Sequence, residues 1–220
     1  MRIMIHAVPK RMWYVNEFLI PQLEEQGFED VRVWLDANGR GNLRSCVESF
    51  ASLPEDGGTW HLQDDVLPCR DFFQRACVLN PGNNLVYGFC SVHNGDDPGQ
   101  RGIVYMPDAW HGFPCVRIPN AWAKAFTWWI ESEASQRPDL KGYVRMNSCD
   151  DYLFTTFCQE NIGTEIAVNA WPCLVEHVDW LIGGSILNEW RGFFCRAESF
   201  ADPDLVEELA DKLKKRRGSL

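Results

Sequence analysis

The feature that most constrains the fold is an alternation of short apolar segments with amphipathic ones in the first part of the chain. Residues 2–8, 31–35 and 59–63 have the pattern of buried strands, and each is followed by a segment with helical periodicity. This alternation is typical of a parallel sheet wound by right-handed crossovers. The sequence therefore predicts an α/β protein with a mostly parallel central sheet flanked by helices, of the Rossmann-like kind.

Local signals place the expected elements. Pro21 predicts a kink or break in a first helix over 12–25, and Gly27 follows that helix as a C-cap. Pro68 is expected to open a helix through 70–76. The remaining expected elements are helices over 43–53 and 120–135, strands over 85–90, 102–106 and 115–118, and a C-terminal surface helix, acidic from Asp202 and basic from Lys212 to Arg217, whose charges follow the helix dipole.

Composition excludes several classes of protein. The 220 residues carry a formal net charge of −10, which counts against a protein that binds nucleic acid through phosphate neutralisation. No Gly-rich loop of the dinucleotide or Walker type follows the first strand. The nine cysteines are scattered singly, and no apolar run approaches the roughly 20 residues that span a bilayer. The short N-terminal strand does not have the pattern of a signal peptide, so we expect a reduced, cytoplasmic protein.

Acidic side chains follow the third predicted strand. Asp64 and Asp65 come directly after residues 59–63, and open α/β sheets bind ligands at the carboxyl ends of their strands. Carboxylates are hard ligands suited to Mg²⁺ or Mn²⁺. The alternative is that both acids only cap the next helix. Loops after the first two strands open on the same edge and bring further candidates for a shared cleft: His6, Lys10, Arg11, Asp36 and Arg40.

The segment Leu62-Gln63-Asp64-Asp65-Val66, placed after a strand–helix–strand–helix–strand unit, resembles the DxD motif of nucleotide-sugar glycosyltransferases with the GT-A fold. The resemblance implies that Asp65 binds a divalent ion, Mn²⁺ or Mg²⁺, that bridges the donor diphosphate, with Asp64 beside it. It also implies that Asp36 contacts the nucleoside. Because His6, Lys10, Arg11 and Arg40 are expected at the same edge of the sheet, we expect them to belong to the donor site as well. Gln63 stands where many members of the family have an acid.

Two later segments extend this resemblance. Asp150 and Asp151 open a predicted helix and resemble the acidic pair that supplies the catalytic base of inverting GT-A enzymes; the alternative is a plain N-cap. The segment 171–178 is similar to one in bacterial and phage-borne transferases in which a His approaches the metal or diphosphate. That His would be His177 here, with a purely structural His as the alternative. Trp110 and His111 would suit an aromatic wall for a sugar ring.

The expected function is a metal-assisted, inverting transfer of a sugar from a nucleotide-diphosphate donor, a UDP-sugar, to a hydroxyl acceptor. Two alternatives stay open: a phage-type enzyme that glycosylates a hydroxymethylated base in DNA, and a non-catalytic sugar-nucleotide-binding or interaction module of the same fold. We expect one glycosyltransferase domain over 1–200, with a nucleotide-sugar-binding half over 1–110 and an acceptor and catalytic half over 111–200. Residues 201–220 would add a C-terminal helix with a basic tail.

Overall fold

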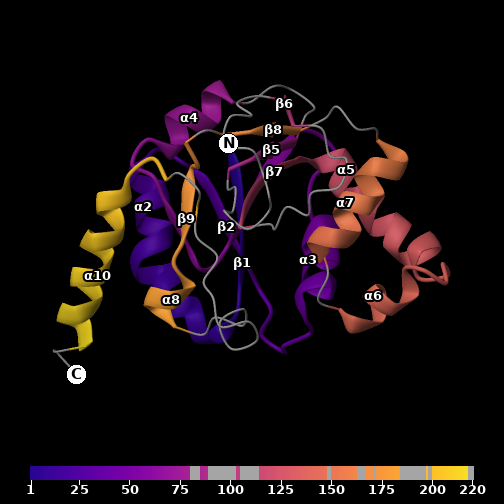
Figure 1. Ribbon diagram of the computed structural model, residues 1–220, viewed down its shortest axis with the longest axis horizontal. Coiled ribbons are helices and arrows are strands. Elements are labelled where there is room, and N and C mark those ends of the chain that lie inside the picture. Colours follow the sequence, from indigo (N-terminus) through magenta and orange to yellow (C-terminus); the bar gives the residue numbers. More distant parts are fainter. Residues whose placement is uncertain are drawn as a thin grey trace.

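The computed structural model describes residues 1–79, 85–88, 103–104, 114–147, 150–162, 167–170, 172–183, 197 and 200–217. Within them, seven strands form one sheet in the order β2-β1-β3-β7-β5-β8-β6 (Figure 1). Their bounds are β1 Arg2–Ala7, β2 Asp30–Leu35, β3 Gly58–Gln63, β5 Leu85–Tyr87, β6 Ile103–Val104, β7 Cys115–Pro119 and β8 Ala167–Asn169. Strands β1, β2, β3, β5 and β8 run in one direction, whereas β7 and β6 run against their neighbours. The predicted mostly parallel sheet is therefore confirmed.

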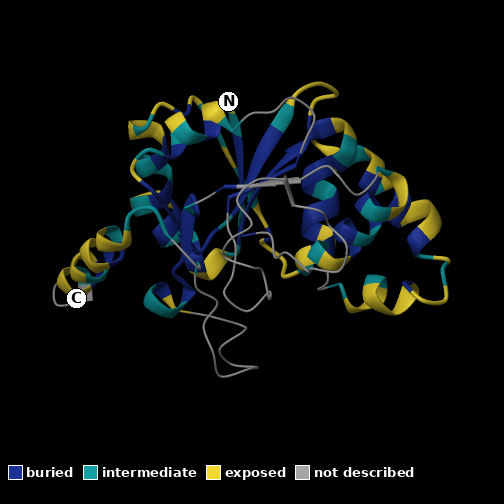
Figure 2. Ribbon diagram, turned by 45° about the horizontal axis from the view of Figure 1, so that its top comes forward, coloured by how far each residue is buried: buried dark blue, intermediate teal, exposed yellow. Residues whose placement is uncertain are grey.

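Helices cover both faces of the sheet (Figure 1). Strand β1 shows why, because Ile3 and Ile5 face one apolar core and Met4 faces the other. The buried strands lie between helices whose outer surfaces are exposed (Figure 2). One layer contains α3 (Asn42–Ala51), α5 (Asn120–Trp129) with its π-helical extension η4 (Ile130–Ala134), α6 (Lys141–Met146) and α7 (Asp150–Asn161); the other contains the helices of residues 12–25, α4 (Phe72–Val78), α8 (Asp179–Ile182) and α10 (Pro203–Arg217).

The first helix is interrupted just before its proline, as the sequence predicts. The chain passes from the 3₁₀ turn η1 (Pro9–Arg11) through α1 (Met12–Tyr14) into a π-helical stretch, η2 (Val15–Leu19), and then α2 (Ile20–Glu25). Pro21 has no N–H, so it cannot make the regular bond to the fourth residue before it, which accounts for the irregular turn. Gly27 ends the helix with φ of +101°, which confirms its predicted role as a cap.

The prediction that Pro68 opens a helix is wrong about where that helix begins. Residues Val66–Pro68 form strand β4, which pairs antiparallel with β9 (Val175–His177), and α4 begins only at Phe72. The physical reason is the apolar run Val66-Leu67, which finds a strand partner from a distant part of the chain, a contact that local sequence patterns do not contain. This β4–β9 ribbon sets Val66 opposite His177.

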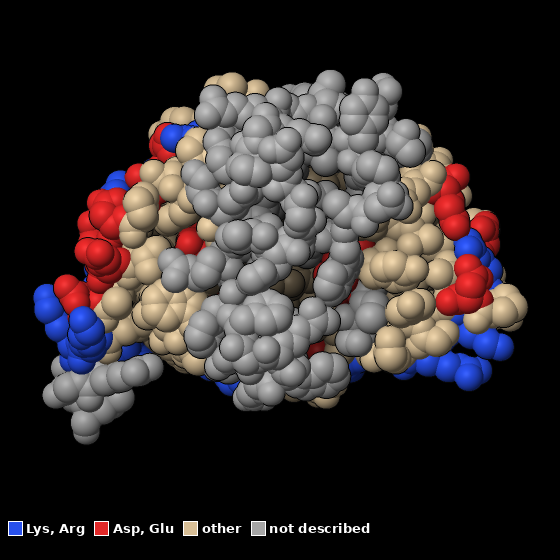
Figure 3. Space-filling view, viewed as in Figure 1, with Lys and Arg blue, Asp and Glu red and all other residues tan. Residues whose placement is uncertain are grey.

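The C-terminal helix α10 packs on the core. Its apolar side contributes Val206, Leu209 and Leu213 to the same core as β1. Arg70 pairs with Asp204 and Glu208 near the start of the helix. Near its end, Arg216 pairs with Glu17 and lies over the ring of Trp13. Acidic side chains precede basic ones along this helix on the left of Figure 3, as predicted. None of the helices in the described ranges has the length and hydropathy of a membrane span.

A glycine fixes the junction between the loop after β2 and the turn before α7. Gly41 has φ of +94°, and a Cβ built there would lie 2.5 Å from the side-chain nitrogen and 2.7 Å from the backbone oxygen of Asn147. Asn147 accepts the N–H of Arg44 at its side-chain oxygen (2.7 Å) and that of Leu43 at its backbone oxygen (3.3 Å). The loop that carries Asp36 and the start of α3 are thus held by these contacts against Asn147, three residues before Asp150.

We expect Gly41→Ala to lower the free energy of unfolding by about 2–4 kcal/mol, because the added methyl group combines a strained φ with overpacking against Asn147. Gly39→Ala is the matched control, since Gly39 also has positive φ (+61°) but nothing within 4 Å of a built Cβ. That variant should lose only about 1 kcal/mol. Urea denaturation of both variants measures the difference, and equal losses would contradict this account of the junction.

Candidate functional site

Asp64 and Asp65 lie in the turn between β3 and β4, at the carboxyl edge of the parallel strands. They are only 3% and 4% exposed. Because β4 separates them from α4, they do not cap that helix, and the alternative role as helix caps is wrong. Two adjacent buried carboxylates need compensating charge or hydrogen bonds, since burial otherwise strongly disfavours their charged forms.

Arg11 supplies much of that compensation. Its Nη1 donates to Asp64 Oδ1 at 2.7 Å and forms a second, short contact with Asp65 Oδ2. The backbone N–H of Val8 donates to Asp64 Oδ2 at 2.7 Å. Arg11 is itself 8% exposed. The turn η1 follows β1 directly, so the chain leaving one strand supplies the cation for the acids that end the neighbouring strand.

The two acids differ in their titration. Burial and the charge of Asp65 raise the pKa of Asp64 to about 6, against the opposing effects of Arg11 and Val8. Burial also opposes ionisation of Asp65, but the attraction of His177 and Arg11 outweighs it and lowers the pKa of Asp65 to about 2. Asp65 is therefore the firmly charged member of the pair at neutral pH.

His177 lies against Asp65 on the β4–β9 ribbon. Its Nε2 is 3.3 Å from Asp65 Oδ1, and its Nδ1 is 3.4 Å from Oδ1 of Asp179, the first residue of α8. The backbone N–H of Val178 also donates to the carbonyl of Asp65 at 2.7 Å. Burial lowers the pKa of His177, but Asp65 and then Asp179 outweigh it and raise that pKa to about 9. Without a ligand, this imidazole is protonated at neutral pH.

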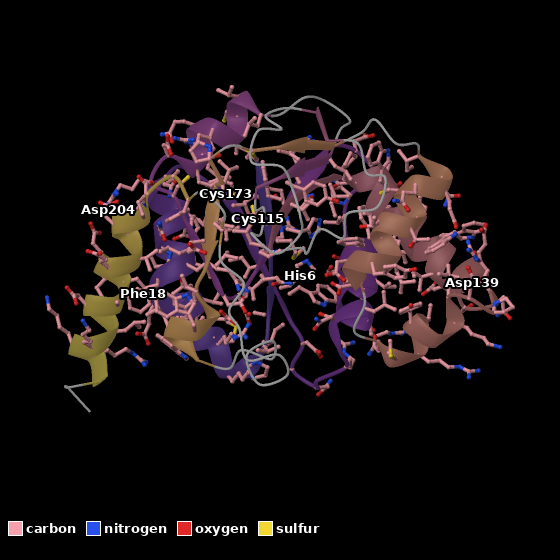
Figure 4. All side chains as sticks on the ribbon, in the orientation of Figure 1. His6, Phe18, Cys115, Asp139, Cys173 and Asp204 are labelled. Carbon is pink, nitrogen blue, oxygen red and sulfur yellow. The ribbon has the colours of Figure 1, made fainter. Side chains whose placement is uncertain are left out.

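His6 belongs to the α3 side of the sheet. Its Nε2 lies 3.0 Å from Nδ1 of His61 on β3, and its ring packs edge-on against Phe50 of α3. Figure 4 shows His6 at the centre of the molecule, between the two groups of helices. Burial lowers the pKa of His6 to about 4, so the ring is neutral at pH 7. Its expected role at the donor site stays a prediction.

The other predicted donor-site residues lie in loops at the same edge. Asp36 is buried and accepts the backbone N–H groups of Arg40 (2.8 Å) and Gly41 (3.0 Å), so its carboxylate closes its own loop. The guanidinium of Arg40 pairs with Glu48 of α3. Lys10 is exposed in η1 beside Arg11. Asp36 therefore has a structural role in its loop. Its predicted contact with a nucleoside stays a prediction.

Asp150 and Asp151 begin α7, as predicted. Asp151 Oδ1 accepts the N–H of Tyr152 at 2.8 Å. Burial and the charge of Asp151 raise the pKa of Asp150 to about 8. Both acids lie near Cys46 of α3, whose thiol pKa is raised by burial and, to a smaller extent, by their charges. These acids thus flank the edge of the sheet from the α3 side.

Two predicted site residues, Trp110 and His111, lie outside the described residues. The structure in turn draws attention to a carboxylate that sequence patterns did not single out. Asp179 is 1% exposed and contacts His177 directly. Its only sequence signal is an acid two positions after His177, at the start of an apolar segment.

The donor atoms around His177 fit a divalent ion that is shared with a phosphate ligand. Neighbouring ligands on one Mg²⁺ or Mn²⁺ are about 3 Å apart, close to the 3.3 Å between Asp65 Oδ1 and His177 Nε2. Such ions are commonly held by one or two protein groups, with phosphate and water completing the shell. Asp64 is a poorer ligand, because both of its oxygens already accept hydrogen bonds.

A second group of potential ligands lies elsewhere, where Cys69, Asp71 and Asp202 bring one donor atom each within 4.8 Å of one another. Asp71 is paired with Arg75, and Asp202 accepts the backbone N–H of Arg70. Burial and Asp71 raise the pKa of the Cys69 thiol to about 12, so the thiolate that a metal would need is strongly disfavoured. This group is therefore the weaker candidate.

No protein-family model matches the sequence, and no curated protein matches it. Among solved structures, the chain is similar to TarS of S. aureus, a glycosyltransferase, with 12% identity and a TM-score of 0.53 over 80% of this chain and 36% of that one. A second structure of the same protein, residues 1–349, matches all of this chain and 72% of that one, with the same identity and score. The chain thus spans about a third of the length of the longer TarS chain. At this identity the likeness shows the fold alone: the chain has a GT-A-like fold.

Proposed function

We propose that this protein is a glycosyltransferase that moves a sugar from a nucleotide-diphosphate donor, a UDP-sugar, to a hydroxyl acceptor. The observation that carries the proposal is the buried cluster of Arg11, Asp64, Asp65 and His177 at the carboxyl edge of a GT-A-like sheet. Acids at this edge are placed to serve a bound ligand. The structural similarity to TarS supports the proposal, because it shows that this fold is compatible with sugar transfer.

The charges of the cluster match a divalent ion. Three carboxylates, Asp64, Asp65 and Asp179, face one guanidinium and one imidazolium, so the cluster has a formal charge of −1. If His177 releases its proton, the charge becomes −2 and Nε2 gains a lone pair for a metal. Asp65 and His177 would hold Mn²⁺ or Mg²⁺, which supplies Lewis acidity to the diphosphate leaving group. Arg11, which contacts both acids, and its exposed sequence neighbour Lys10 would bind diphosphate oxygens directly.

Asp150 is our candidate for the catalytic base. Its pKa of about 8 lies near neutrality, the range in which a carboxylate is most effective as a proton acceptor. Asp151 bonds into its own helix turn, which fits a cap better than a base. Deprotonated Asp150 would take the proton of the acceptor hydroxyl as that oxygen attacks the anomeric carbon. With one base and no enzyme nucleophile, inversion at that carbon follows.

Replacement of the proposed ion-binding residues should strongly reduce turnover and leave the fold intact. We expect Asp65→Asn and His177→Asn each to lower the Mn²⁺-dependent release of UDP from UDP-sugars by about 10²–10³-fold, because the leaving group loses its electrophile. Asp211→Asn, at an exposed position on α10, is the control and should retain wild-type release. Circular dichroism checks the fold of each variant. Undiminished release from folded Asp65→Asn would contradict the assignment.

The pH dependence of the same reaction tests Asp150. Only the ionised carboxylate accepts a proton, so kcat should rise about tenfold per pH unit below the pKa and level off above about pH 8. Asp150→Asn should lower kcat by about 10²–10⁴-fold and remove this rise, whereas Asp151→Asn should keep the shape of the profile. A rise that survives in Asp150→Asn would show that another group is the base.

The second candidate is a non-catalytic module that binds sugar nucleotides. The observation that favours it is the pairing of Arg11 with both acids, which already neutralises much of their charge without a metal. Such a protein would bind a UDP-sugar with no metal-stimulated release of UDP. Measuring UDP-sugar binding by calorimetry, together with the assay of Mn²⁺-dependent UDP release described above, separates the two candidates.

The pairing itself is testable through stability. Arg11→Ala should lower the free energy of unfolding by about 3–5 kcal/mol at pH 7, because it leaves the buried Asp64 without its cation and leaves Asp65 paired with His177 alone. Arg11→Lys keeps the charge but not the guanidinium geometry and should lose less. Adding Asp64→Asn to Arg11→Ala should recover part of the loss, since one unpaired charge disappears. Urea denaturation measures all three, and a loss under about 1 kcal/mol for Arg11→Ala would contradict a structural role for the pairing.

A further inference from the structure

His177 is held between two buried carboxylates. Nε2 faces Asp65 across 3.3 Å, and Nδ1 faces Asp179 across 3.4 Å. Asp179 is 1% exposed and begins α8, where its Oδ1 also accepts the N–H of Trp180 at 2.8 Å. The short helix therefore fixes the carboxylate on the side of the imidazole ring that points away from Asp65.

A neutral imidazole carries one N–H, and its position decides which nitrogen can bind a metal. If Nδ1 keeps the proton and donates it to Asp179, the lone pair lies on Nε2 and faces the space beside Asp65. The other tautomer would point an N–H at that space and could not ligate an ion there. A carboxylate behind a metal-bound imidazole also makes it a stronger ligand.

We propose that Asp179 is a positioning residue that holds His177 in the Nδ1–H tautomer, so that Nε2 binds the divalent ion beside Asp65. The inference rests on the proposed function, because it assigns Asp179 a role in the same ion site. Asp179 acts through His177 and touches neither donor nor acceptor.

Glu176 provides a matched control. It is a buried carboxylate on the same strand, 3% exposed, and its Oε1 accepts the backbone N–H groups of His177 (2.9 Å) and Ala197 (2.8 Å). Glu176→Gln thus removes the charge of a neighbouring buried carboxylate that accepts the backbone N–H of His177. It leaves in place the carboxylate of Asp179, which faces Nδ1. A general effect of losing buried charge would appear in both variants, but an effect through the ring nitrogen only in Asp179→Asn.

The first experiment measures Mn²⁺ binding by electron paramagnetic resonance, with Mn²⁺ alone as the probe. Asp179→Asn should raise the Kd for Mn²⁺ about 10–100-fold, and Glu176→Gln should leave it near the wild-type value. In a His177→Asn background, Asp179→Asn should have no further effect, because its action passes through the ring. An unchanged Kd in folded Asp179→Asn, or an equal loss in the His177→Asn background, would overturn the proposal.

The second experiment uses the wild-type protein, so it does not depend on how the variants fold. With Mg²⁺ and UDP bound, the ¹⁵N shifts of the imidazole, assigned by their loss in His177→Asn, should report a protonated Nδ1 and an unprotonated Nε2. A proton on Nε2 would overturn the proposal. If the protein binds UDP-sugar but no divalent ion, the role of Asp179 fails while donor binding stands; if it binds neither, the proposed function fails as well.

Discussion

The pairing of Arg11 with Asp64 and Asp65 is the interaction on which the rest of the site depends. Two adjacent carboxylates, 3% and 4% exposed, would be costly to bury without a cation within hydrogen-bond distance. Through this pairing, Arg11 holds the turn after β1 against the turn after β3. The carboxyl edge of the sheet therefore contains a buried, negatively charged cluster. Strand pairing alone would align β1 with β3 but would leave this edge unspecified.

The β4–β9 ribbon brings the later part of the chain to the same place. Val66 and His177 are cross-strand partners, so the residue after Asp65 is held opposite the candidate metal-binding His. Asp179 then follows at the start of α8 and supports the imidazole from behind. Across the sheet, Asn147 and Gly41 join the loop of Asp36 to the turn before Asp150. Segments that are distant in the sequence thus lie together at one edge of the sheet. In the proposed reaction, donor and acceptor would bind at this edge.

Local sequence patterns predicted much of this arrangement and missed the parts that depend on distant partners. The strands of the first half, the interruption before Pro21 and the start of α7 at Asp150 follow from periodicity and from proline and acidic signals that act over a few residues. Strand β4 does not, because Val66–Pro68 is a strand only through its pairing with β9. Asp179 was missed for the same reason, since its contact with His177 requires the fold. The hydrogen bonds that Asp36 accepts within its own loop likewise could not be predicted from local sequence patterns.

We propose that Asp65 and His177 together bind the ion that accompanies a nucleotide diphosphate. Anomalous diffraction at the manganese edge, from crystals grown with Mn²⁺ and UDP, tests it most directly. If both residues bind the ion, an anomalous peak should lie about 2.1–2.3 Å from both Asp65 Oδ1 and His177 Nε2, with diphosphate oxygens completing the shell. A peak at Cys69, Asp71 and Asp202 instead, or UDP bound at this edge with no manganese beside Asp65, would contradict it.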